Sequence, residues 1–163
     1  MKKGIMNYFD PFSLVFWNTI GVAVLCGAII GIERQLRGKP AGVRTSCLIC
    51  LGTAIFIHLG AGITDGGNAD PSRVLGQLVT GVGFLGGGVI LAREGVVTGV
   101  TTAAVIWVLA AIGATIGYGH FPGAIVLSIV TVAILTGVEM LEAGTKKLRR
   151  GVHAREKKRS TDQ

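Results

Sequence analysis

Residues 95–138 read GVVTGVTTAAVIWVLAAIGATIGYGHFPGAIVLSIVTVAILTGV, and none of these 44 residues is Asp, Glu, Lys or Arg. A membrane-spanning helix needs about 20 predominantly apolar residues, so this stretch has room for two helices. Near its centre, residues 117–122 (GYGHFP) combine two glycines with a proline, which is a turn signal. The pattern predicts two transmembrane helices, residues 99–117 and 121–141.

Three shorter uncharged stretches come earlier in the chain. They are residues 11–32, 45–64 and 74–92, with 22, 20 and 19 residues. Each is long enough for one membrane span. The predicted helices are residues 13–32, 43–60 and 71–92.

The composition supports the membrane interpretation. Only 15% of the residues are charged, whereas soluble domains carry about 25%. A soluble helical bundle would also need polar faces at helical spacing, and these stretches have none. We therefore predict an all-α polytopic integral membrane protein with five transmembrane helices.

The distribution of basic residues predicts the orientation. If the C-terminus is cytoplasmic and the N-terminus outside, thirteen of the sixteen Lys and Arg residues lie on the inner side. The predicted organisation is a transmembrane domain, residues 1–145, followed by a basic cytoplasmic tail, residues 146–163. No nucleic-acid-binding fold accompanies the tail. We interpret the tail as an orientation signal that contacts anionic lipid headgroups, with no nucleic-acid partner.

Charged and polar residues gather in two places, at opposite ends of the predicted helices. The first group, here the Arg34 cluster, has two open interpretations. It sets topology through salt bridges at the headgroup level, or it binds a partner protein, an anionic lipid or a nucleotide-like anion. Its members are Glu33, Arg34, Gln35, Arg37, Arg44 and Arg93.

The second group, here the Arg73 cluster, consists of Asp70, Arg73 and Gln77. Asp70-Pro71 is a typical helix start, because Asp is a good N-cap and Pro suits the first helical position. A helix cap with an ion pair is the favoured interpretation, although an exposed pair contributes only about 0–1 kcal/mol. The alternative is an outward-facing cation or proton site.

Pairs of glycines four residues apart occur in three of the predicted helices. This spacing lets two helices approach closely within a membrane. The helix at 71–92 also contains so many glycines that its backbone is expected to press against neighbours or to be locally broken. The pairs are Gly27 and Gly31, Gly83 and Gly87, and Gly113 and Gly117.

Nothing in the sequence indicates catalysis, a bound metal or a cofactor. Cys47 and Cys50 form a Cys-x-x-Cys inside a predicted helix. A zinc site needs four ligands, and no second Cys or His pair is at hand, so we interpret both as buried small apolar residues. No nucleophile and base stand out as a pair, which predicts that the chain is not an enzyme.

Several ordered motifs together resemble the MgtC/SapB family of bacterial inner-membrane proteins. Thr101, Thr102 and Trp107 belong to the last of these motifs, and Thr101 is expected to cap its helix. The motifs are GIERQ (31–35), GKPAGVRT (38–45), DPSR (70–73), TGVGFLGGGVI (80–90) and GVTTAA (99–104).

The resemblance implies the family's hydrophobic membrane domain, in the bacterial inner membrane, with the N-terminus outside. MgtC-like members are linked to magnesium limitation, stress and virulence, and are thought to regulate other membrane proteins. The MgtC branch carries a soluble C-terminal domain, whereas this chain ends in the basic tail, so activities of that domain are not carried over.

The expected function is that of a non-enzymatic membrane protein that regulates or associates with other membrane proteins, and forms homo-oligomers. The alternative is a small transporter or channel for Mg²⁺ or another cation. A broken glycine-rich helix at 71–92 would then expose carbonyl groups to the ion. The charged residues all lie at predicted helix ends, whereas transport pathways usually place ionisable groups deeper in the membrane.

Overall fold

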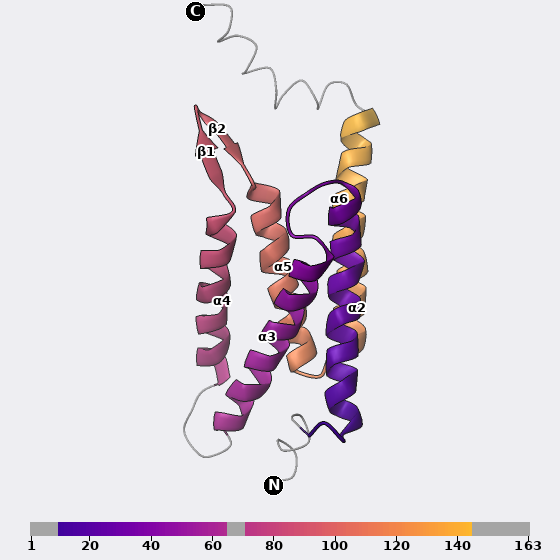
Figure 1. Ribbon diagram of the computed structural model, residues 1–163, viewed down its shortest axis with the longest axis vertical. Coiled ribbons are helices and arrows are strands. Elements are labelled where there is room, and N and C mark those ends of the chain that lie inside the picture. The colour runs from indigo at the N-terminus through magenta and orange to yellow at the C-terminus, as the bar shows by residue number, and fades with distance from the viewer. Residues whose placement is uncertain (1–9, 65–70, 145–163) are drawn as a thin grey trace, which may run out of the picture. The chain divides into compact units, whose positions relative to one another are not determined.

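The computed structural model describes residues 10–64 and 71–144 (Figure 1). Apart from short turns and one hairpin, the described chain is helical, which confirms the predicted all-α polytopic membrane fold. The elements are α2 (Leu14–Leu36), α3 (Val43–Thr64), α4 (Pro71–Gly88), β1 (Leu91–Arg93), β2 (Val96–Thr98), α5 (Val100–Gly117) and α6 (Phe121–Gly144).

Within the described residues, four helices are long and apolar enough to cross a membrane: α2, α3, α5 and α6. The helix α4 has 18 residues, which corresponds to about 27 Å against a hydrocarbon core of about 30 Å. It is less apolar because it includes Arg73, Gln77 and many glycines. The sidedness of the termini stays a prediction from the charge distribution.

The chain divides into two compact units, one up to residue 129 and one from residue 130. In the first unit, α3 packs against α2 and α5, and α4 packs against α5 and α3 (Figure 1). A core cluster of Val82, Ile106 and Ala110 joins α4 to α5. The described part of the second unit, residues 130–144, is the remainder of α6.

Glycines end α2 and α5 in the same way. After α2, Gly38 has φ +62°, its N–H donates to the carbonyl of Gln35, and Lys39 N–H donates to the carbonyl of Arg34. After α5, Gly119 has φ +81° and the same pair of hydrogen bonds forms. Both are Schellman motifs, which favour glycine at the left-handed position.

The first helix is longer than predicted. It was expected to end at residue 32 and instead continues to Leu36. Glu33, Arg34 and Gln35 are good helix formers, and the helix stops only where Gly38 adopts a left-handed backbone. The charged residues of the Arg34 cluster therefore begin within the helix, where their side chains can be buried.

The third predicted helix is shorter than expected, because α4 ends at Gly88 and residues 91–98 form an antiparallel hairpin. All three residues of β2, Val96, Val97 and Thr98, are β-branched, and such residues favour strands. Glu94 and Gly95 both have positive φ (+49° and +81°), as a two-residue hairpin turn requires. The expectation of helix up to residue 92 was therefore wrong.

The start of α5 also differs from the prediction. Its N-cap is Gly99, with φ +88° and no side-chain hydrogen bond. A side chain at Gly99 would overlap the carbonyl of Val89, so the backbone approach itself requires glycine. Thr101 lies inside the first helical turn and does not cap the helix.

Candidate functional site

Arg34 lies on the last turn of α2, and its side chain is buried between helices. Only 2% of the residue is exposed. Its Nη2 donates a hydrogen bond of 3.0 Å to Oγ1 of Thr102, on the first turn of α5. A guanidinium in an apolar setting is costly unless it is paired. The bond therefore connects α2 to α5 through a charged group.

Glu33, the neighbour of Arg34, is also buried, with 8% exposed. Its Oε1 lies 2.6 Å from Nε of Arg37, one helical turn later. Among the described residues, the other carboxylate oxygen, Oε2, has no hydrogen-bond partner. The end of α2 thus holds one carboxylate and two guanidinium groups within about one helical turn.

Gln35 has a different role, because its side chain reaches the start of α3. Its Oε1 accepts a hydrogen bond of 3.4 Å from the Val43 N–H. A Cβ at Gly42 would lie 3.2 Å from the same oxygen. The Ser46 hydroxyl also donates to the carbonyl of Ala41 at 3.0 Å. These bonds fix the loop at residues 38–42.

The structure brings together only part of the predicted Arg34 cluster. Glu33, Arg34 and Arg37 interact with one another or with Thr102. Arg44 is exposed on the first turn of α3, and Arg93 is the last residue of β1. From the α5 motif, Thr102 is buried, whereas Thr101 and Trp107 are exposed.

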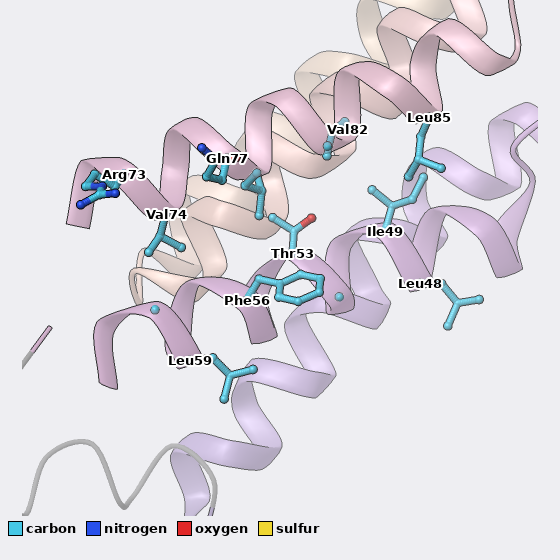
Figure 2. Close-up of a pocket in the computed structure, with 14 residues that line it drawn as sticks. Leu48, Ile49, Thr53, Phe56, Leu59, Arg73, Val74, Gln77, Val82 and Leu85 are labelled. Atoms are coloured by element: carbon cyan, nitrogen blue, oxygen red, sulfur yellow. The ribbon is translucent and has the colours of Figure 1, made fainter. Parts of the chain in front are cut away.

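The Arg73 cluster is described only in part, because Asp70 lies outside the described residues. Arg73 and Gln77 are exposed and one turn apart near the start of α4. Both line one end of a groove between α3 and α4, with a volume of about 820 Å³ (Figure 2). The capping and ion-pair interpretation of Asp70 stays a prediction.

The groove was not predicted from the sequence. Its lining includes Thr53 and Phe56 from α3 and Val74 from α4, with mostly apolar side chains throughout. Figure 2 shows Phe56 and Val74 in the space between the two helices. Residues four apart on α3 and α4 line it, but lipid-facing residues have the same spacing. The sequence pattern alone therefore does not reveal the groove.

Two of the three glycine pairs lie where helices touch. A Cβ at Gly27 would be 2.5 Å from the Cα of Cys47, and one at Gly31 would be 2.5 Å from the Cα of Val43. On α5, Gly113 and Gly117 lie equally close to α3. The third pair differs, because a Cβ at Gly83 or Gly87 meets nothing within 4 Å.

The cysteines bridge helices through weak hydrogen bonds. The thiol of Cys47 contacts the carbonyl of Val24 on α2, and that of Cys50 contacts the carbonyl of Leu109 on α5, both at 3.4 Å. In the described part of the chain, no group of three or more His, Cys, Asp and Glu residues is arranged to hold a metal ion.

Comparison with known proteins places this arrangement in a family. Residues 20–143 match the model of the MgtC family. A protein of Escherichia coli K12 described as "Putative magnesium transporter YhiD" is 49% identical over 119 residues, or 69% of this chain and 55% of that protein. Protein MgtC of Salmonella typhimurium LT2 is 45% identical over 109 residues, or 66% and 46%. No solved structure matches.

A further relative extends the match over most of the chain. An uncharacterized protein of Haemophilus influenzae is 34% identical over 161 residues, 94% of this chain and 65% of that protein. The chain thus spans about half to two thirds of the length of these curated relatives. The chain has four apolar helices that are long enough to span a membrane among its described residues. Together with these matches, they identify a multi-pass bacterial membrane protein. The chain belongs to the MgtC family.

Proposed function

We propose that this chain is a non-enzymatic membrane protein that associates with a transmembrane helix of another membrane protein and modulates that protein. The supporting observation is that one face of α4 consists of small, exposed residues. They lie on one side of the helix because they are spaced four, three and four residues apart: Gly76, Thr80, Gly83 and Gly87.

The other glycine pairs show what such spacing is used for in this molecule. At Gly27 and Gly113, backbone atoms of α3 occupy the space where a side chain would be. At Gly76, Gly83 and Gly87 that space is open. Each helical glycine costs about 1 kcal/mol relative to alanine in water. A face with several of them suits the close approach of another helix.

The neighbouring side chain adds to this surface. Phe84 is 83% exposed and projects beside the small residues. A large apolar ridge next to a shallow face gives the shape complementarity that helix packing in membranes depends on, since lipid removes any hydrophobic driving force. The same face also suits a second copy of this chain, which would give the expected homo-oligomer.

Site-specific photocrosslinking in cells tests this proposal. We expect a photoreactive residue at Thr80 to give a discrete protein adduct, which is lost when Gly83→Leu is added. The matched control is a photoreactive residue at Leu25, an exposed position on α2, which should give no discrete adduct. An adduct of twice the chain mass indicates self-association, and another mass indicates a different protein. Equal labelling at both positions would contradict the proposal.

Cation transport is the second candidate, and one observation favours it. Glu33 is buried with a carboxylate oxygen that lacks a hydrogen-bond partner among the described residues. Buried ionisable groups in membrane segments often belong to ion pathways. The YhiD relative also carries the description "Putative magnesium transporter".

Liposomes that contain only this protein separate the two candidates. Under the proposed function we expect no flux of Mg²⁺, K⁺ or H⁺ above that of empty liposomes. Flux that disappears in Glu33→Gln or Arg34→Ala would establish transport and replace the proposal.

A further inference from the structure

The groove between α3 and α4 lies on the side of α4 away from the small-residue face. Its walls are apolar along most of their length, and Arg73 is the one charged residue among the described residues that line it. Gln77 lies one turn further along the same helix. Figure 2 shows these two polar side chains toward one end, with Leu85 and Ile49 facing one another at the other end. The groove therefore has a polar end and an apolar end.

Its length matches one leaflet of a membrane. Arg73 and Leu85 are twelve residues apart, or about 18 Å along a helix. Half of the hydrocarbon core is about 15 Å. Arg73 lies in the first turn of α4, where a long basic side chain reaches the headgroup region. A molecule aligned with the groove would extend from the headgroups to about the bilayer centre.

The size of the groove suits a small molecule. Its volume of about 820 Å³ lies in the range of about 300–1,000 Å³ that is usual for small-molecule sites. Its mostly apolar walls match the chemistry of flexible acyl chains.

The charge at the polar end indicates the headgroup. Arg73 is exposed near the start of α4 and lines the polar end of the groove. Arginine binds phosphate through two parallel N–H donors, and Gln77 supplies a further N–H donor one turn deeper. A headgroup that carries its own amine would place a second cation near Arg73, which is unfavourable.

We propose that this groove binds one anionic phospholipid, with its acyl chains between α3 and α4 and its phosphate on Arg73. Phosphatidylglycerol is favoured over phosphatidylethanolamine because it lacks the amine. This site is independent of the proposed docking face, which uses Gly83 and Gly87 on the other side of α4.

Native mass spectrometry of the full chain in mild detergent, titrated with each lipid, tests the proposal. We expect one phosphatidylglycerol per chain, bound at least tenfold more tightly than phosphatidylethanolamine. Arg73→Gln should abolish this preference, and Arg73→Lys should restore part of it. A wild-type protein without the preference, or an Arg73→Gln variant that keeps it, would overturn the assignment.

Two glycines on α4 provide a matched pair of variants. Gly81 lines the groove and Gly83 does not, and a Cβ at either position meets nothing within 4 Å. Gly81→Leu should weaken phosphatidylglycerol binding at least tenfold, whereas Gly83→Leu should leave it unchanged. Equal binding by both variants contradicts the proposal. Dimer loss in Gly81→Leu with lipid binding intact would assign the groove to a second copy instead.

Discussion

At the scale of single residues, the end of α2 depends on a buried guanidinium. Arg34 is almost fully enclosed and donates from Nη2 to Thr102. A donor that loses its partner inside a protein costs about 1–3 kcal/mol, and more when it is charged. Loss of the Thr102 hydroxyl is therefore expected to lower the free energy of unfolding clearly, although the group is small.

Thr102→Val tests this role, because valine keeps the shape of threonine and removes the hydroxyl. We expect the variant to lose about 1–3 kcal/mol of unfolding free energy, measured by thermal or denaturant unfolding in detergent. Thr101→Val is the control, since Thr101 is exposed one residue earlier and should change stability by less than about 0.5 kcal/mol. Similar losses in both variants would show that the hydrogen bond is unimportant.

At the scale of secondary-structure elements, glycines decide how closely helices meet. Along α2, Gly21 meets open space and Gly27 meets the backbone of α3. Both glycines lie within one continuous helix, so replacing either by alanine should improve helix propensity by a similar free energy. Any difference between substitutions at the two positions therefore reports on helix packing.

Gly21→Ala and Gly27→Ala test this by comparing the stability of the two variants. Gly27→Ala places a Cβ 2.5 Å from the Cα of Cys47, and overpacking of this kind costs about 1–3 kcal/mol. Gly21→Ala should be neutral or stabilising by up to about 1 kcal/mol, because it only improves helix propensity. Unfolding in detergent measures both. A neutral Gly27→Ala would mean that α2 and α3 separate without cost.

At the scale of the whole molecule, the distribution of basic residues predicts the orientation in the membrane. Thirteen of sixteen Lys and Arg residues fall on one side of a five-span topology. Short basic segments stay in the cytoplasm. The tail at residues 146–163 and the loop at residues 38–42 are therefore expected on the same, inner side.

Reporter fusions test this orientation. Green fluorescent protein fused after Gln163 should fluoresce, and alkaline phosphatase fused at the same position should be inactive. Inserted into the segment at residues 65–70, the two reporters should behave in the opposite way. An active phosphatase at the C-terminus would reverse the predicted topology.

Much of the architecture was predictable, and the candidate sites only in part. Uncharged stretches located the helices, and the turn at residues 117–122 separates α5 from α6 as expected. The hairpin at residues 91–98 was missed because its strands have only three residues each and follow an apolar helix without a clear break in the pattern. The burial of Arg34 was missed because α2 continues past the last uncharged residue, and its partner Thr102 is 68 positions away in sequence.

The sequence by itself determined that this chain is a multi-span membrane protein. Backbone groups in lipid must be hydrogen-bonded within the protein, which favours a helix for each long uncharged stretch. Only the tertiary structure decided what each glycine face does. Gly27 and Gly31 share their spacing with Gly83 and Gly87, yet only the first pair touches another helix of the chain. Spacing specifies a face on one helix, whereas a contact also depends on how the neighbouring helices are placed and rotated.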